Sequence, residues 1–158
     1  MPMVQLSNNS LSDFVRQVVF GFQNRCQTNS IRLELDIEDV DTPFSCDTIK
    51  TAAASLLEHA IESLPDGGEI EVTLINSEYQ WELEVAHCES KETETPETVG
   101  LKIYTESEHQ MRLEAASLTL GGSVQTWKCP LGGLAHVLIV PKLENGLSGR
   151  DLSHNKAA

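Results

Sequence analysis

The sequence predicts an α+β protein, a two-layer sandwich in which about three helices pack on one face of a mixed, mostly antiparallel sheet of five or more strands. Two observations lead to this fold class. Apolar residues recur every three or four positions in three segments, as on the buried face of a helix, and they alternate with polar residues in the segments between. The elements run helix, strand, short strand, helix, two strands, helix, two strands, an order that favours separate layers of helices and strands.

The most regular stretch runs from Ser45 to Ile75 and contains one helix followed by one strand. Its first part carries an apolar stripe at helical spacing, made of Ile49, Ala52, Ala53, Leu56, Leu57, Ala60, Ile61 and Leu64. Ser45 or Asp47 can cap the start of this helix, and the Pro-Asp-Gly-Gly turn at 65–68 ends it. The period then changes to two, as in a strand with one buried face.

The flanking segments complete the sandwich. Ser10 and Asp13 form a capping-box pattern before a first helix, whose apolar stripe extends from Leu11 to Phe22. A third helix is expected from about Glu106 to Leu120. We expect it to bury a broad apolar face, made of Met111, Leu113, Ala115, Ala116, Leu118 and Leu120. The remaining strands are expected at 31–37, in a short piece around Phe44, at 81–85, at 123–128 and at 134–140.

The chain is expected to form one domain over residues 1–142, followed by a polar, flexible tail over residues 143–158. Between the predicted strand at 81–85 and the third helix, the composition changes to Glu, Lys, Thr, Ser and Pro. Such a segment cannot bury a core, so we expect a mobile loop from Glu89 to Thr98.

The composition is that of an ordinary globular domain with an acidic surface. Hydrophobic residues make up 40% of the chain, and Asp and Glu outnumber Lys and Arg by 24 to 11, which gives a net charge of −13. This charge repels phosphate backbones and anionic lipids, so we expect neither nucleic acid nor a membrane as a partner. A protein partner with a basic surface fits the charge better. Solubility alone accounts for such acidity as well.

Cysteine spacing and the chain ends predict a cytoplasmic protein. Four cysteines lie far apart, without the spacing of a zinc finger or a redox motif, and we expect free thiols at Cys26, Cys46, Cys88 and Cys129. The first residues lack the pattern of a signal peptide. No apolar run approaches the ~18 residues that a membrane span needs.

The segment from Ser55 to Leu74 carries a resemblance to a known family. Its residues, SLLEHAIESLPDGGEIEVTL, are similar to the asparagine-box helix and the following strand of the histidine-kinase-type ATPase domain. This is the GHKL superfamily, with the Bergerat fold, shared by sensor kinases, gyrase, Hsp90 and MutL. The likeness covers about residues 10–142 and is next strongest at 113–141. It implies the same two-layer sandwich and a place in two-component-like signalling.

The resemblance also implies a nucleotide pocket, and several of its positions depart from the ligands of the family. The family places a magnesium-binding Asn where this chain has His59, and commonly another polar ligand where it has Ser55. It accepts the adenine amino group with an Asp, followed by glycines, where this chain has His87 and then Cys88. A neutral imidazole can accept one hydrogen bond but lacks the fixed charge of a carboxylate.

The glycines that the resemblance implies are only partly present. The second glycine box, which holds phosphates at a helix start, is reduced to Gly100. Gly132 and Gly133 persist in the last turn, but the Thr that often follows them is replaced by Leu134 or Ala135. A turn needs glycines whatever its ligand. The expected pocket positions are therefore Ser55, His59, His87, Cys88, Gly100, Gly132 and Gly133.

Two other interpretations of the histidines stay open. His59 lies beside the apolar stripe and can be a solvated helix residue. His59, His87 and Cys88 together are also a possible zinc set. Because three ligands from two elements need a special geometry, we expect no metal site, and we assign no catalytic residue.

The residues lead to two hypotheses of function. The favoured one is a degenerate domain of this family, a non-catalytic regulatory or protein-interaction module (a pseudokinase) that needs no cofactor. The alternative is an ATP-binding kinase domain with an unusual pocket that holds ATP and magnesium, either the catalytic part of a sensor kinase or an anti-sigma-type serine kinase. Each lost buried ligand costs ~1–3 kcal/mol, so the loss of two or three favours the first hypothesis. Whether the chain is an enzyme is left undecided.

Overall fold

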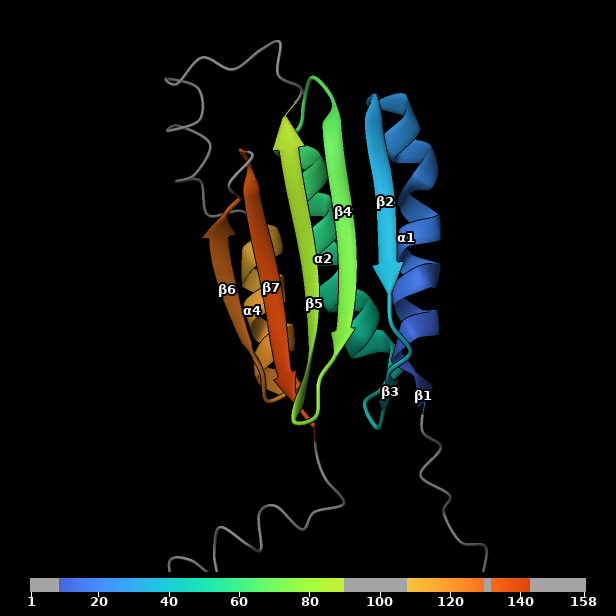
Figure 1. The fold of residues 1–158 in the computed structure, drawn as a ribbon, viewed down its shortest axis with the longest axis vertical. Helices are drawn as coiled ribbons and strands as arrows, with labels where there is room; N and C mark the ends of the chain where they lie inside the picture. The colour runs from blue at the N-terminus through green and yellow to red at the C-terminus, as the bar shows by residue number, and fades with distance from the viewer. Residues whose placement is uncertain (1–8, 90–107, 130–131, 143–158) are drawn as a thin grey trace, which may run out of the picture.

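The computed structural model describes residues 9–89, 108–129 and 132–142, and these form a two-layer α+β sandwich as predicted. Helices and strands follow one another as β1 (Asn9–Ser10), α1 (Leu11–Thr28), β2 (Ile31–Ile37), β3 (Asp41–Thr42), α2 (Cys46–Glu62), β4 (Gly68–Asn76), β5 (Gln80–Glu89), α4 (Glu108–Thr119), β6 (Ser123–Lys128) and β7 (Leu134–Pro141). In Figure 1 α1, α2 and α4 lie side by side behind one sheet, and no helix among the described residues lies on its other face.

Five strands form the main sheet, in the order β2-β4-β5-β7-β6. β2 and β4 are parallel and are connected through α2, whereas the other three pairs are antiparallel. The short strand was predicted around Phe44 but lies at Asp41–Thr42, where it pairs with β1. Phe44 instead lies in a bend with Pro43, and its N–H donates to Thr42 Oγ1 at 3.2 Å. The proline has no N–H for a strand ladder, which explains the shift.

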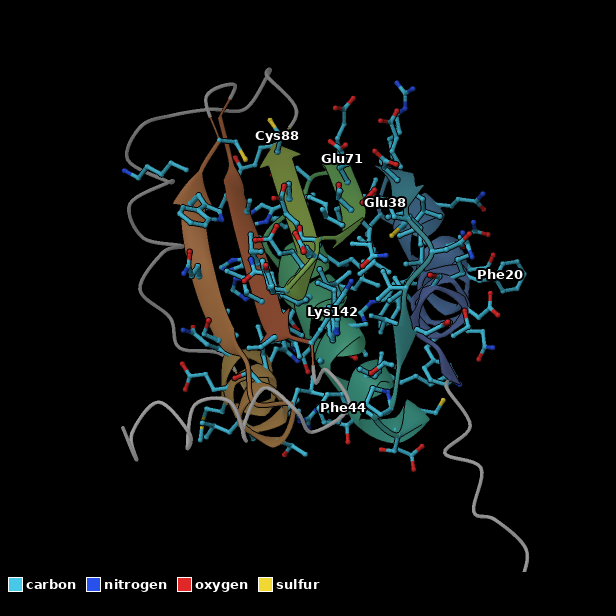
Figure 2. All side chains as sticks on the ribbon, turned by 60° about the horizontal axis from the view of Figure 1, so that its bottom comes forward. Phe20, Glu38, Phe44, Glu71, Cys88 and Lys142 are labelled. Atoms are coloured by element: carbon cyan, nitrogen blue, oxygen red, sulfur yellow. The ribbon has the colours of Figure 1, made fainter. Side chains whose placement is uncertain are left out.

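α1 begins at the predicted cap. Ser10 is its N-cap residue, and the Ser10 hydroxyl accepts a hydrogen bond from the Asp13 N–H at 3.2 Å. Leu11, Val15 and Val19 are fully buried on its inner face. The opposite face points into solvent, as the exposed Phe20 shows (Figure 2).

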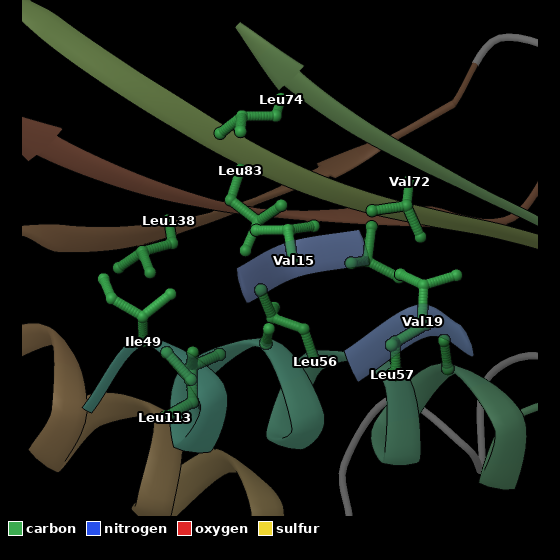
Figure 3. Close-up of a cluster of buried hydrophobic side chains, with 14 of the residues drawn as sticks. Val15, Val19, Ile49, Leu56, Leu57, Val72, Leu74, Leu83, Leu113 and Leu138 are labelled. Carbon is green, nitrogen blue, oxygen red and sulfur yellow. The ribbon is translucent and has the colours of Figure 1, made fainter. Parts of the chain in front are cut away.

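α2 lies at the centre of the helical layer and contacts α1, α4 and β5. Every residue of its predicted apolar stripe is buried. Figure 3 shows how Leu56 and Leu57 meet side chains from α1 and from the sheet. Ser45 is the N-cap residue as predicted, but its side chain makes no capping hydrogen bond.

α4 buries a narrower face than the predicted one. Leu113, Ala116 and Leu120 are buried, but Met111 is 67% exposed and Leu118 is 79% exposed. The prediction of one broad buried face was therefore wrong. α4 packs against α2 on one side and covers β6, and no third helix in the described part of the chain lies on its far side.

Several predictions fall outside the described residues. They concern the loop after Glu89, the Gly100 position and the tail at 143–158. Among the helices that the structure describes, none is both long and apolar enough to cross a membrane.

Candidate functional site

Four of the five histidines of the chain come together on the side of the sheet that faces the helices. His59 lies on α2, His87 on β5, His109 on α4 and His136 on β7. They are far apart in the sequence, so the fold alone gathers them.

Three of these imidazoles form a packed group, which we call the histidine cluster: His59, His87 and His136. The ring centres of His59 and His136 are 4.6 Å apart, and the two rings meet edge to face at 83°. His87 lies 6.4 Å from His59 and 6.2 Å from His136, measured between ring centres. The interpretation of His59 as a solvated residue was therefore wrong, because its ring faces two other imidazoles.

The strand alternation places two members of the cluster. His87 follows Val85 at inward positions of β5, and His136 precedes Leu138 at inward positions of β7. His87 is only 6% exposed. In the pairing of β5 with β7, His136 lies opposite Val85. The imidazoles of His87 and His136 therefore point to the same side of the sheet, toward the helices.

A side chain of the neighbouring strand β6 also contacts His136. Its Nδ1 atom is 3.0 Å from the Thr126 hydroxyl of β6. Its Nε2 atom is buried and has no hydrogen-bond partner among the described residues. Burial, together with the nearby His59, lowers the pKa of His136 to about 4. His136 is therefore neutral at pH 7.

The pKa of His59 is shifted in the same direction as that of His136. Burial lowers the pKa of His59, Glu62 opposes this effect, and His109 adds to it. His59 is therefore neutral at pH 7 as well. A neutral imidazole offers one nitrogen lone pair and no charge.

His109 joins α4 to α2. Its Nδ1 atom lies 2.8 Å from Glu58 Oε2, and its Nε2 atom lies 2.9 Å from Glu62 Oε1. Glu58 and Glu62 are one helical turn apart, so the imidazole spans two carboxylates on the same face of α2. This contact fixes the first turn of α4 beside the histidine cluster.

A cavity of about 80 Å³ lies between α2, α4, β6 and β7. It is lined by polar and apolar side chains together: Ser55, Leu56, His59, His109, Gln110, Leu113, Glu114, Val124, Thr126 and His136. Ser55, which the resemblance predicted as a pocket residue, is 4% exposed. Its hydroxyl donates to the Thr51 carbonyl at 2.8 Å.

Cys88 lies apart from the histidines. It is the neighbour of His87 on β5, and successive strand residues point to opposite faces of the sheet. Figure 2 shows it near the end of β5. The zinc set of His59, His87 and Cys88 is therefore not assembled. Within the described residues, no three His, Cys, Asp or Glu side chains are arranged to hold a metal ion.

Gly132 and Gly133 form the turn before β7, with φ angles of 98° and 87°. A Cβ atom at Gly133 would collide with the backbone carbonyl of His87. The backbone therefore requires glycine here without any ligand, in agreement with the sequence-based argument.

Two residues of the site were missed by the sequence analysis. His136 occupies an inward position in an otherwise apolar alternation, from Leu134 to Val140, and this pattern could have identified it. His109 has no such signal, because its partners lie on another helix.

No family model matches the sequence, and no curated protein matches it significantly. Solved structures do match. The nucleotide-free catalytic domain of histidine kinase ThkA matches with a TM-score of 0.69 and 18% identity, over 86% of this chain and 96% of that chain. A mycobacterial sensor histidine kinase, MprB, matches with a TM-score of 0.67 and 14% identity, over 85% of this chain and 96% of that chain.

A third match is ThkA in complex with the response regulator TrrA. Its TM-score is 0.67 at 19% identity, over 87% of this chain and 42% of that chain. These matches cover most of the chain, which has the fold of histidine kinase catalytic domains, the GHKL-type ATPase fold.

Proposed function

We propose that this chain is a non-catalytic member of the histidine-kinase-type ATPase fold, a protein-interaction module that binds neither ATP nor magnesium. The main support is the histidine cluster. The resemblance places the magnesium ligand at His59 and the adenine acceptor at His87, and these two imidazoles pack in one group with His136.

The chemistry of the replacing groups supports the loss of magnesium. Magnesium prefers oxygen ligands in octahedral geometry, whereas imidazole nitrogens suit softer divalent metals. Burial lowers the pKa of His59, so its ring is neutral rather than a cation that could attract phosphates. At the position of His87, an imidazole replaces a carboxylate that would carry a fixed negative charge.

The size of the cavity also supports the proposal that the chain binds no nucleotide. Pockets that bind small molecules and cofactors are typically about 300–1,000 Å³. The cavity beside the cluster measures about 80 Å³, which suits water molecules rather than a nucleotide. Within the described residues, the side chains of His59 and His136 border this space.

The face of the sheet that points away from α1, α2 and α4, here called the acidic face, carries many carboxylates, and this supports a partner with a basic surface. Outward positions of β2, β4 and β5 carry six carboxylates, at Glu34, Asp36, Glu69, Glu71, Glu82 and Glu84. Arg32 is the one basic residue at these positions, and it pairs with Glu34 at 2.8 Å. Burial raises the pKa of Glu84, and Glu71 and Glu82 raise it further through repulsion. A cationic partner would relieve this repulsion.

A nucleotide titration tests the proposal. Calorimetry with ATP and ADP, with and without magnesium, is expected to give no binding in the micromolar range. The matched variant is His59→Asn with His87→Asp, which restores the two ligands that the resemblance implies. Magnesium-dependent micromolar binding by the wild-type chain would refute the proposal and favour the kinase hypothesis.

Affinity capture tests the partner. The wild-type chain and a Glu71→Lys/Glu84→Lys variant serve as paired baits at low salt. A basic protein that is retained by the first bait and lost by the second supports the acidic face as the binding surface. Equal retention by both baits would place the partner elsewhere.

A further inference from the structure

We propose that the acidic face binds a basic amphipathic helix of a partner protein. The apolar side of that helix lies over β6 and β7, and its cationic side lies over β4 and β5. This inference rests on the proposed function as a protein-interaction module, and it specifies the kind of segment that the partner presents.

The register of the strands places apolar and acidic side chains in separate halves of this face. Outward positions of β7 carry Ala135, Val137 and Ile139. Ala135 pairs with Trp127 of β6 on one side and with Ala86 of β5 on the other. The six carboxylates all lie on β2, β4 and β5. One half of the acidic face is therefore apolar, and it directly adjoins the charged half.

Trp127 is the exposed anchor of the apolar half. Thr126 meets His136 on the helix side of the sheet, so Trp127, the next residue of β6, points to the opposite side. Trp127 is 49% exposed, and no helix among the described residues covers this face. Tryptophan is enriched among the residues that dominate binding energy between proteins, because it buries a large apolar area on contact.

The width of the face suits one helix. The strands follow one another as β4-β5-β7-β6, and neighbours lie about 4.7–4.9 Å apart, so β4 and β6 are separated by about 14 Å. A helix with its side chains is about 10–12 Å wide. A helix over β5 and β7 therefore reaches the carboxylates on one flank and Trp127 on the other.

The carboxylates also match the spacing of cations along a helix. Glu82 and Glu84 are two residues apart on β5, which corresponds to about 6.4–6.8 Å. Residues four apart on one side of a helix are about 6 Å apart along its axis. Glu71 of β4 lies diagonally next to Glu84 across the pair of strands. Lysine or arginine at positions i and i+4, beside an apolar stripe, is therefore the expected sequence pattern of the partner.

Two other occupants fit this face less well. An extended segment gains backbone hydrogen bonds at the edge of a sheet, whereas a face presents only side chains and favours a segment with internal backbone bonds. A second copy of the chain carries the same net charge of −13, which opposes self-association. A cationic helix with one apolar side complements both halves.

The test is a titration of the full chain with a peptide of about 18 residues, long enough to form a helix. Leucines form one stripe of this peptide, lysines at i and i+4 flank the stripe, and alanines fill the rest. Acrylamide quenching reports binding, because Trp127 is exposed while Trp81, the other tryptophan, is 2% exposed. We expect a saturable blue shift and the loss of the quenchable fluorescence. A scrambled peptide of equal composition is expected to bind at least roughly tenfold more weakly.

Variants of the chain locate the site by calorimetry at low salt. Glu71→Gln/Glu84→Gln and Trp127→Ala are each expected to weaken binding of the leucine–lysine peptide roughly tenfold or more. Asp47→Asn/Asp66→Asn is the matched control. It removes the same charge from the first turn of α2 and from the turn after α2, away from this face, and should leave the affinity unchanged.

Three results would overturn the inference. They are the absence of saturable binding at about 1 mM peptide, equal binding of the scrambled peptide, and undiminished binding by the Glu71→Gln/Glu84→Gln variant. The proposed function fails on a different result, magnesium-dependent binding of ATP. A basic protein captured through the acidic face, without any binding of the helical peptide, would refute this inference and leave the proposed function standing.

Discussion

α2 and α4 show the same apolar periodicity in the sequence and meet very different surroundings. All eight apolar residues of the predicted α2 stripe are buried, whereas Met111 and Leu118 of α4 are exposed. α2 lies between α1 and α4 and also contacts β5, so neighbours cover a wide part of its surface. α4 lies at one end of the helical layer. The number of neighbours, and not the apolar pattern, decides how wide a face a helix buries.

The largest expected effect tests the buried side of this comparison. Leu57→Ala should lower the free energy of unfolding by about 2–5 kcal/mol, because a fully buried leucine leaves a cavity in the core. Urea denaturation at pH 7.5 measures the change. A loss below 1 kcal/mol would mean that the centre of α2 is less tightly packed than its burial indicates.

The second prediction concerns pH. The folded-state pKa of His136 is about 4, below its ordinary value of 6.5, so the unfolded state binds the proton more readily. The stabilising contribution of neutral His136 is complete above pH 6.5 and is lost as the pH falls from about 6.5 to about 4. The loss amounts to no more than about 3.4 kcal/mol, from a shift of about 2.5 pKa units at 1.36 kcal/mol per unit.

Urea unfolding between pH 7.5 and 4.5, with a metal chelator present, measures this loss. His136→Gln is the control, because the variant should show a flatter dependence over the same range. Equal slopes for the two proteins would contradict the assignment. The lowered pKa of His59 adds an effect of the same sign.

His59→Ala sharpens the comparison along one helix. His59 lies on α2, two residues after Leu57, but it is half-buried and faces imidazoles instead of the apolar core. We expect a loss of about 1 kcal/mol, clearly smaller than that of Leu57→Ala. Thermal and urea unfolding of the two variants, measured side by side, give the ranking. The opposite ranking would show that the cluster stabilises α2 more than the core does.

The smallest effect is expected on the exposed side of α4. Leu118→Ala should change the free energy of unfolding by less than about 0.5 kcal/mol, since the side chain is 79% exposed and alanine favours helix. Leu113→Ala, five residues earlier and buried, is the matched control and should cost several times more. A large loss at Leu118 would indicate that a neighbour covers α4 in solution.

Much of the fold could be predicted, because local periodicity specifies each element. The spacing of apolar residues identified α1, α2 and the main strands, and the glycines at 132–133 marked the turn before β7. The cap that Ser10 provides for α1 could likewise be predicted, because it involves residues close together in the sequence. The site was predicted less completely, since His59 and His87 were identified while His109 and His136 were not.

The sequence by itself determined the fold class and the central helix, and it placed His59 and His87 where the resemblance implies other ligands. These follow from residue identity and from periods of 3.6 and 2, which depend on near neighbours in the chain. Only the tertiary structure decided that His136 joins them, because the register between β5 and β7 sets which residues meet. It also decided that α4 leaves half of its apolar residues in solvent. Contacts between distant segments depend on how whole layers pack, and no local pattern records that.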